Sequence, residues 1–402
     1  MTRSEAKVGI VGCIVFALAY PSAVASSLLI APLMAFTALI MLPLWPHSWR
    51  DVRWPWASIP LALFLAWVGI SFLWSPHDDP QQIPKTVLGI PLYILFAVRV
   101  GMLEGRWRSR VEAMLIFTVF ALGLFLFAET LTGGSGTASF KTTVEGVNYA
   151  RHSDLMIDVN RSLGHAAAPL VLLAGPAVFL AWYKGGPLIG IVLGLLTLVA
   201  AFSFETQVNA AAYVIAAIAA GLALRFPRPM LAVTFGGIAG AVVTMPLIVP
   251  GILNSLPPSV VESIPLSWAW RLEIWAFASE LIYQAPWFGH GLDASRPLSA
   301  TIEVAGRELE GLPLHPHNSA LQIWLETGLV GALLLGGALV ALGEQLSLNK
   351  FIGRIQCAAI VWVAVSYAVL LIFSYGAWQE WHQGAVALAA SAVFFLRAKN
   401  SA

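Results

Sequence analysis

Two histidines that flank a proline stand directly before a long apolar segment, and their side chains are suited to proton transfer. The motif reads His315-Pro316-His317-Asn318-Ser319. An imidazole titrates near neutral pH, so a histidine at the mouth of a membrane helix can exchange protons at the membrane surface. A His-x-His pair can also bind a metal, but no nearby cysteine or closely spaced carboxylate completes a zinc site. We therefore expect no metal.

Polar side chains continue from this motif into the apolar segment. Gln322 and Glu326 follow Asn318 at intervals of four residues, which places all three on one face of a helix. An ionisable group inside a membrane span usually serves function unless it is paired. Asn318 has a second interpretation, because asparagine is a favoured helix N-cap.

A second candidate lies about 45 residues earlier, in a Trp- and Phe-rich segment that runs from Trp268 to Tyr283. Its spacing predicts an amphipathic helix lying on the membrane surface. One face would carry Trp268, Leu272, Trp275 and Ile282. Arg271 is the only basic residue of this segment. Its guanidinium either reaches toward lipid headgroups or holds a phosphate, whose oxygens match the planar fork.

The amino-acid composition indicates the class of protein that must position these groups. Of 402 residues, 58% are hydrophobic and 11% are charged, whereas soluble domains carry about 25% charged residues. This excludes a water-soluble globule, and the high hydrophobicity excludes disorder. The net charge is +1, so we expect no nucleic-acid partner. Cys13 and Cys357 both lie in apolar runs and predict no disulfide framework.

Apolar runs of about 20 residues predict an all-α polytopic membrane protein with about twelve transmembrane helices. The predicted spans are 7–23, 26–44, 57–74, 83–100, 111–131, 163–183, 187–204, 208–225, 230–250, 319–343, 355–375 and 381–397. The large loop 251–318 separates the ninth and tenth spans and contains the amphipathic helix. The first apolar run could also be read as a signal peptide. We expect it to be retained, because a second apolar run follows at once.

Charge distribution predicts the orientation. If both termini are cytoplasmic, most of the 22 basic residues fall in cytoplasmic segments, as the positive-inside rule requires. The two long loops, 132–162 and 251–318, then lie on the periplasmic side together with every histidine except His47. We therefore expect the chemistry on the periplasmic face.

Two motifs together resemble the O-antigen ligase family. They are Pro286-Trp-Phe-Gly-His-Gly-Leu292, and His317-Asn318 followed by nine residues and Gly328-Leu-Val-Gly331. The stretch Asp158-Val-Asn-Arg161 resembles the start of the family's shared domain. The resemblance covers about residues 160–345. It divides the chain into N-terminal helices (1–131), a periplasmic loop (132–162), a ligase-like core (163–345) and two C-terminal helices (346–402).

The resemblance implies a metal-independent, inverting glycosyltransferase in the bacterial inner membrane, in contact with membrane lipids. Its donor would be a glycan on undecaprenyl pyrophosphate. Its acceptor would be a hydroxyl of lipid A–core in ligases, or the growing glycan in polymerases. The resemblance assigns His317 to the acceptor hydroxyl as general base and Arg271 to the pyrophosphate. His315, Asn318 and Glu326, beside the motif, are expected to contact substrate.

This sequence departs from the family at one point. Ligases usually carry a second arginine 65–75 residues before the loop arginine, and segment 203–209 has none. Arg161 could supply the charge, Gln207 and Asn209 could bind the phosphate as neutral groups, or the activity could differ. The departure weighs against a ligase, whereas the unbroken His-Asn motif favours one.

Two further alternatives stay open from the sequence. A protein O-oligosaccharyltransferase of the same family usually has a longer C-terminal portion. A lipid or solute transporter would place ionisable groups near the middle of the membrane. The candidates here lie instead toward the outer ends of the spans: Glu129, Glu205, Glu326 and Glu380.

Overall fold

The computed structural model describes residues 3–42, 55–204 and 207–397, and the described chain is mostly helical. The predicted span 26–44, the predicted cytoplasmic segment that follows it, the C-terminus and Glu205 lie partly or wholly outside these ranges. The elements, in chain order, are α1 (Arg3–Ser26), η1 (Ser27–Leu29), α2 (Ile30–Met41), α3 (Ser58–Ser71), η4 (Phe72–Trp74), α4 (Gln82–Val87), α5 (Gly89–Gly101), α6 (Gly105–Leu131), α7 (Ser135–Thr143), α8 (His152–Gly185), α9 (Pro187–Phe202), α10 (Gln207–Arg225), α11 (Pro227–Ser255), α12 (Pro258–Ser263), α13 (Leu266–Gln284), β1 (Thr301–Val304), β2 (Arg307–Glu310), α14 (Ser319–Leu348), α15 (Arg354–Phe373) and α16 (Glu380–Phe394).

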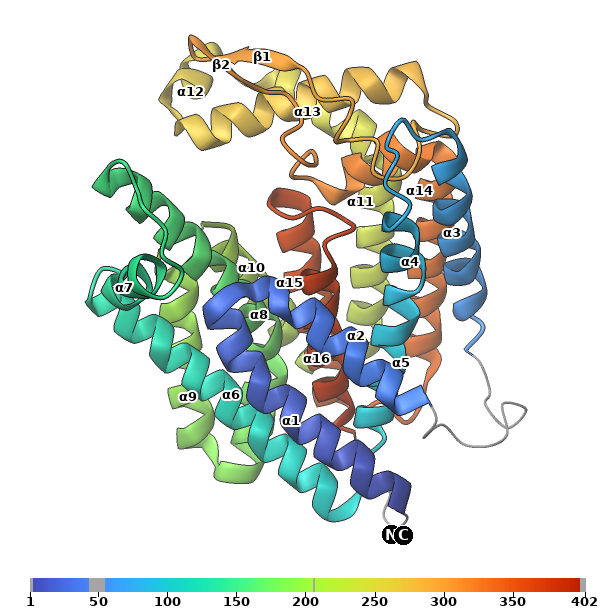
Figure 1. Ribbon diagram of the computed structural model, residues 1–402. Helices are drawn as coiled ribbons and strands as arrows, with labels where there is room; N and C mark the ends of the chain where they lie inside the picture. Colours follow the sequence, from blue (N-terminus) through green and yellow to red (C-terminus); the bar gives the residue numbers. More distant parts are fainter. Residues whose placement is uncertain (1–2, 43–54, 205–206, 398–402) are drawn as a thin grey trace.

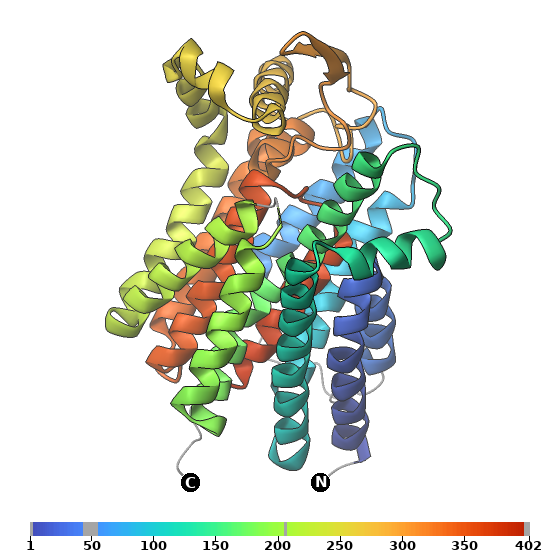
Figure 2. The same ribbon diagram turned by 90° about the vertical axis from the view of Figure 1, so that its left-hand side faces the viewer.

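The long helices run side by side, and the short elements gather at one end of the bundle. Figures 1 and 2 show α12, α13 and the β1–β2 hairpin at this end, which we call the α13 end. The start of α1 and the end of α16 lie at the opposite end of the bundle. Long segments that are far apart in sequence pack together, notably α11 along α14 and α10 along α15.

In the described residues, eight helical segments are long and apolar enough to cross a membrane. They are Ser4–Met41, Gln82–Gly101, Gly105–Leu131, His152–Gly185, Gln207–Arg225, Pro227–Ser255, Ser319–Leu348 and Arg354–Phe373. Two more apolar helices are shorter, Ser58–Trp74 and Pro187–Phe202. Every predicted span overlaps a helix, but the first two lie in one continuous helical segment. The number twelve therefore stays a prediction, whereas the polytopic helical architecture is confirmed.

Helix α8 forms the centre of the bundle, because small residues along it let neighbouring helices approach closely. Ala166, Ala167 and Ala174 are fully buried. Gly175 leaves room for the ring of Trp362 on α15, whose Nε1 donates to the carbonyl oxygen of Val171 at 2.8 Å. The helix begins at His152, eleven residues before the predicted span. Part of the predicted loop 132–162 is therefore helical, since α7 lies there as well.

The structure is consistent with an all-α membrane protein, and the described residues add one short β-hairpin. Residues 301–304 and 307–310 pair as an antiparallel hairpin in which Thr301 faces Glu310. Ala305 and Gly306 form its two-residue turn with positive φ values of 48° and 74°, the conformation that tight hairpins require. The hairpin is tied to α13, because Trp270 Nε1 donates to the carbonyl oxygen of Glu310 at 2.8 Å.

Helix α13 lies across the end of the bundle (Figure 1). Ile274, Trp275, Ala278 and Ile282 are buried, whereas Glu273 and Glu280 are exposed. The predicted helix is therefore present, and one of its faces is buried. That face packs on the protein, since α13 contacts both α11 and α14 and Trp275 Nε1 donates to the carbonyl oxygen of Pro316 at 3.0 Å.

A break in α14 joins the two sequence motifs. At Gly328 the backbone leaves the helical conformation, with φ 64° and ψ −165°. The backbone N–H and carbonyl groups that lose their helical partners at this break form hydrogen bonds with loop 286–292. His290 N and Gly291 N donate to the carbonyl oxygens of Leu325 and Glu326, each at 2.8 Å, and Leu329 N and Val330 N donate to those of Pro286 and Trp287 at 2.9 and 3.3 Å.

Glycines make this close approach possible. A Cβ on Gly328 would lie 2.4 Å from the carbonyl carbon of Trp287, and one on Gly289 would lie 2.5 Å from that of Glu326. Both glycines have positive φ, which side chains disfavour. Trp67 of α3 completes the junction, because its Nε1 donates to the carbonyl oxygen of Thr327 at 2.9 Å.

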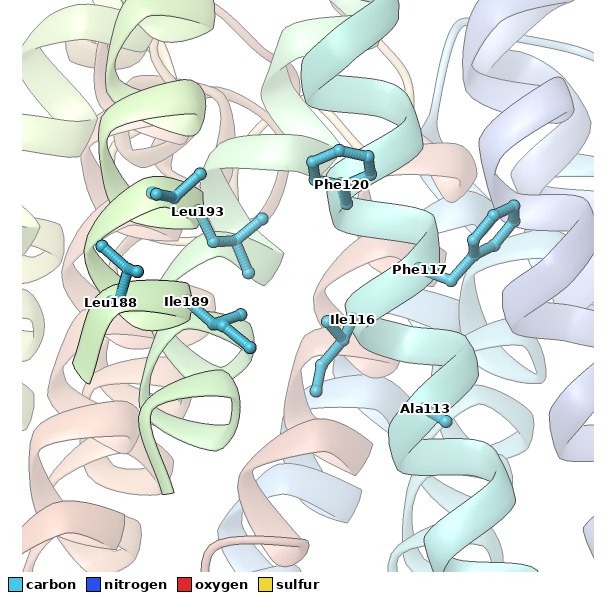
Figure 3. Close-up of a pocket in the computed structure, with 8 residues that line it drawn as sticks. Ala113, Ile116, Phe117, Phe120, Leu188, Ile189 and Leu193 are labelled. Atoms are coloured by element: carbon cyan, nitrogen blue, oxygen red, sulfur yellow. The ribbon is translucent and has the colours of Figure 1, made fainter. Parts of the chain in front are cut away.

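A groove of about 460 Å³ lies between α6 and α9, remote from this junction. Figure 3 shows its lining, and every side chain in it is apolar: Ala113, Ile116, Phe117, Phe120, Leu188, Ile189, Val192 and Leu193. Without a polar group it has nothing to orient a glycan or a phosphate. The groove is therefore suited to a hydrocarbon chain, and we look for chemistry at the α13 end.

Gly328→Ala should destabilise the protein, because the new methyl group combines a positive φ with a backbone clash. We expect a loss of about 2 kcal/mol or more, seen as a lower thermal unfolding midpoint of the detergent-purified protein. Gly337→Ala is the matched control, since Gly337 lies in the same helix with open space around its Cα. Equal midpoints for the two variants would contradict the proposed role of the junction.

Candidate active site

His317 has one ring nitrogen committed to the protein and one free for chemistry. Its Nδ1 lies 2.8 Å from the carbonyl oxygen of Ser374, in the loop between α15 and α16. A carbonyl oxygen only accepts, so Nδ1 carries the proton and donates it. In the neutral ring Nε2 then holds a lone pair. This is the arrangement a general base requires, with the tautomer fixed by a partner behind the ring.

The turn before α14 gives His317 this orientation. His317 adopts a positive φ of 53°, a conformation that only a well-fixed non-glycine residue keeps. Its backbone N–H donates to Nδ1 of His315 at 3.1 Å, and the two ring centroids are 4.7 Å apart. The carbonyl oxygen of Pro316, between the two histidines, is held by Trp275 of α13.

His315 and Asn318 serve the fold in this structure. His315 is 6% exposed, and its second nitrogen, Nε2, lies 3.3 Å from Nε2 of Gln379. Asn318 caps α14, because its Oδ1 accepts from the backbone N–H groups of Ala320 and Leu321 at 3.0 Å each. The N-cap interpretation of Asn318 is therefore confirmed. Contact of either residue with substrate stays a prediction.

Arg271 presents a guanidinium near this base. Its Cζ lies 5.2 Å from the centroid of the Trp268 ring, and Nη1 donates to the carbonyl oxygen of Ser267 at 3.2 Å. Nε is buried without a hydrogen-bond partner, and no described carboxylate forms an ion pair with the guanidinium. An anionic ligand would supply the missing acceptors.

Burial is the largest influence on the pKa of both groups and lowers each of them. Burial lowers the pKa of His317 below the usual imidazole value, the hydrogen bond to Ser374 opposes this shift, and the positive charge of Arg271 lowers it further. Burial also lowers the pKa of Arg271, and that of His315 well below its usual value. Near neutral pH the His317 ring is thus neutral and able to accept a proton.

Gln207 lies at the start of α10 and Arg161 lies in the N-terminal part of α8. Oε1 of Gln207 accepts from Nε1 of Trp268 at 3.2 Å, so Gln207 braces the ring against which Arg271 rests. Arg161 is exposed and lies one turn before His165. The His165 ring is 5.8 Å from that of Tyr375, in the α15–α16 loop. Gln207 is thus joined to the site through Trp268. A role for Arg161 in the site stays a prediction.

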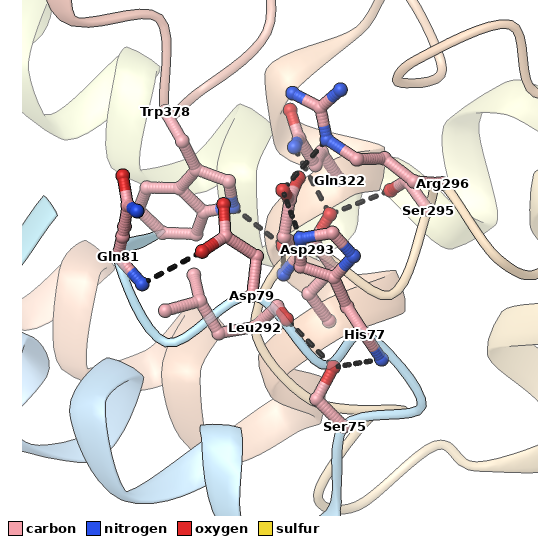
Figure 4. A network of polar contacts seen from close by, with 11 residues as sticks. Ser75, His77, Asp79, Gln81, Leu292, Asp293, Ser295, Arg296, Gln322 and Trp378 are labelled. Carbon is pink, nitrogen blue, oxygen red and sulfur yellow. Dashed lines mark hydrogen bonds and ion pairs between the residues drawn. The ribbon is translucent and has the colours of Figure 1, made fainter. Parts of the chain in front are cut away.

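Glu326 is fully buried and accepts four hydrogen bonds. Figure 4 shows the four residues that supply the donors: Asp293, Ser295, Gln322 and Trp378. Ser295 Oγ and Gln322 Nε2 donate to Oε1 at 2.6 and 3.0 Å, and the Asp293 backbone N–H donates to Oε2 at 2.7 Å. Trp378 Nε1 also donates to Oε2. The carboxylate is thus occupied by protein groups, and the expectation that it contacts substrate stays without structural support.

Several residues of the site were missed by sequence reasoning. Ser374, Tyr375 and Trp378 lie in the α15–α16 loop, and the dense aromatic and polar run around them is a signal that could have been used. Asp293 forms an ion pair with Arg296 at 2.7 Å and lies 3.4 Å from Nε2 of His77. Among the described residues no cluster of three or more His, Cys, Asp or Glu side chains could hold a metal ion.

These features define an integral membrane protein with a histidine–arginine centre at one end of its helical bundle. Residues 164–336 match the family model described as O-antigen ligase, close to the predicted core. No solved structure gives a significant match.

Curated relatives come from Rickettsia species and carry the description "Putative polysaccharide ligase". The chain is 28% identical to one of R. conorii over 357 residues, covering 85% of this chain and 81% of the relative. It is 25% identical to one of R. prowazekii over 327 residues, covering 79% and 75%. It is 31% identical to one of R. bellii over 168 residues, or 39% of each chain. The family model and these relatives support an O-antigen ligase family for this chain, which confirms the resemblance carried by the motifs.

Arg271→Ala should raise the pKa of His317. The guanidinium disfavours the imidazolium form, so removing it makes protonation easier and moves the titration midpoint to higher pH. Nitrogen NMR of histidine-labelled protein measures this midpoint, which we expect to lie below the usual 6.5 in the wild type. Arg307→Ala, on the exposed hairpin, is the control and should leave it unchanged. A wild-type midpoint above 6.5 would contradict the site.

Proposed function

We propose that this protein transfers an oligo- or polysaccharide from a polyprenyl pyrophosphate carrier to an acceptor hydroxyl on the periplasmic face of the bacterial inner membrane. The observation that carries the proposal is the pairing of a free imidazole nitrogen on His317 with a nearby guanidinium that lacks an acidic partner in the described residues. Within this class we propose ligation of O-antigen to lipid A–core, with undecaprenyl pyrophosphate as carrier.

The chemistry assigns one role to each group. Nε2 of His317 accepts the proton of the acceptor hydroxyl, whose oxygen attacks the anomeric carbon of the donor. The bond from that carbon to the pyrophosphate breaks, and the electron pair leaves with the pyrophosphate. Arg271 stabilises the charge that develops there. A single displacement inverts the anomeric configuration. The guanidinium supplies the positive charge that a metal ion would otherwise supply.

Orientation follows from charge. The basic residues between helices favour the end of the bundle that carries the termini as the cytoplasmic side. The α13 end is then periplasmic, where a lipid-linked donor and lipid A–core would both be reachable. Membrane lipids surround the bundle in this arrangement.

A polymerase of the same family is the second candidate. It would use the same donor and take the growing glycan as acceptor. The observation in its favour is the absence of an arginine in segment 203–209. Gln207 in that segment contacts Trp268 and not a charged group among the described residues.

His317→Ala should lower transfer at least a hundredfold at normal abundance, because the acceptor loses its base. Arg271→Ala should do the same, and Arg271→Lys should keep part of the activity, since a point charge replaces a planar fork. The assay is complementation of a deletion strain, read on a glycan-stained gel of lipopolysaccharide. His152→Ala is the control, since His152 is an exposed histidine at the start of α8.

The deletion strain distinguishes the candidates. Loss of all O-chains with accumulation of lipid-linked glycan indicates a ligase, whereas a single capped repeat in place of a ladder indicates a polymerase. Full activity in both the His317→Ala and Arg271→Ala variants would overturn the assigned site.

Chelation should leave the reaction unchanged, because the proposed mechanism stabilises the leaving group with Arg271. We expect purified protein in proteoliposomes to transfer glycan at the same rate with and without EDTA. Loss of most activity in EDTA, restored by a divalent cation, would contradict the mechanism.

A further inference from the structure

Glu326 lies at the meeting point of three chain segments that are far apart in sequence. Its four hydrogen-bond donors come from α14 itself, from residues 293–295 and from the α15–α16 loop. An ionised carboxylate only accepts and has about four lone-pair sites. Three of the donors, the Asp293 N–H, the Gln322 amide and the Trp378 indole, offer no acceptor atom in these bonds. Three of the four bonds therefore require Glu326 to act as an acceptor, and only the Ser295 hydroxyl could accept a proton from it.

Two of these bonds connect Glu326 to the loop that contacts His317. Trp378 donates its indole N–H to Glu326. Gln322 donates to Glu326 through Nε2 and accepts the backbone N–H of Ala377 at its Oε1, at 2.8 Å. Consecutive loop residues are thus attached to one carboxylate, once directly and once through Gln322.

The same loop also contacts His317 and the first residue of α14. The carbonyl oxygen of Ser374 accepts from Nδ1 of His317, and that of Tyr375 accepts from Ser319 Oγ at 2.8 Å. Residues 374–379 form no strand and no helix, so these attachments hold the segment in place. A shift of the Ser374 carbonyl would release the Nδ1 proton and allow the other tautomer, which places a proton on Nε2.

We propose that Glu326 is a positioning residue, which holds the 374–379 loop so that Ser374 keeps His317 in its base-competent tautomer. This inference rests on the proposed function, in which Nε2 of His317 accepts the proton. Glu326 acts through Trp378 and Gln322 and does not contact substrate. This role differs from the sequence-based prediction, in which Glu326 contacts substrate because it is an ionisable residue inside a membrane span.

Trp378→Phe tests the proposal most cleanly, because it removes one donor and keeps the aromatic packing. Glu326→Gln is the second variant, since an amide brings an N–H group against donors. We expect kcat to fall about ten- to a hundredfold, with KM changed by less than about twofold, because the base is misplaced and the substrate contacts stay. Transfer from undecaprenyl-pyrophosphate-linked glycan to lipid A–core in proteoliposomes measures both constants.

Trp324→Phe is the matched control. Trp324 also lies on α14, and its Nε1 donates to a backbone carbonyl, that of Val242 on α11, at 2.8 Å. The change removes a comparable hydrogen bond on another side of the helix. Its kcat should stay near the wild-type value at similar thermal stability.

Nitrogen NMR of labelled His317 supplies a readout that general loss of stability does not move. The wild type should show a protonated Nδ1 and an unprotonated Nε2. Trp378→Phe and Glu326→Gln should show a mixture of tautomers, and Trp324→Phe the wild-type pattern. Wild-type kcat and tautomer in Trp378→Phe, or an equal fall of kcat in Trp324→Phe, would overturn the positioning role.

The outcomes also separate the two proposals. Full activity in His317→Ala would defeat the proposed function, whatever Glu326 does. An inactive His317→Ala beside a fully active Trp378→Phe with the wild-type tautomer would defeat the positioning role alone.

Discussion

The break of α14 at Gly328 is the constraint on which the rest of the site depends. A helix that loses backbone hydrogen bonds inside a membrane protein must find new partners for the released groups. Loop 286–292 supplies them with two N–H donors and two carbonyl acceptors, and Trp67 adds a fifth bond. This exchange fixes loop and helix in one register. It also brings Asp293 and Ser295 next to Glu326, whose carboxylate then gathers the α15–α16 loop.

The chemistry follows from how this scaffold treats two charged or titratable groups. Nδ1 of His317 donates to a carbonyl oxygen, so Nε2 of the neutral ring carries the lone pair. Arg271 rests on Trp268, and its positive charge lowers the pKa of His317, which favours the neutral ring. A neutral base under the electrostatic influence of a cation suits a reaction in which a hydroxyl loses a proton while a pyrophosphate leaves. Buried structural groups such as His315 and Asn318 keep the turn rigid around that pair.

Much of this could be predicted from the sequence, because the relevant signals are local. Apolar runs identified the helices, the Trp-rich spacing identified α13, and the position of Asn318 indicated an N-cap. The hairpin at 301–310 was missed because its strands have four residues each. The hydrogen-bond partners of Glu326 were missed for a different reason. Helical spacing places it on a face with Gln322, but it cannot tell whether that face meets substrate or another loop. The Ser374 contact is made by a main-chain oxygen 57 residues from His317, and main-chain contacts leave no signature in side-chain identity.

The central claim is that this chain alone couples glycan transfer to release of a polyprenyl pyrophosphate. The most direct test is a proteoliposome that contains only the purified protein, undecaprenyl-pyrophosphate-linked glycan and lipid A–core, with carrier release and product counted together. Our account predicts one carrier released for each glycan transferred, with no metal added. Movement of the intact lipid-linked glycan across the bilayer without cleavage, or no transfer at all, would contradict it.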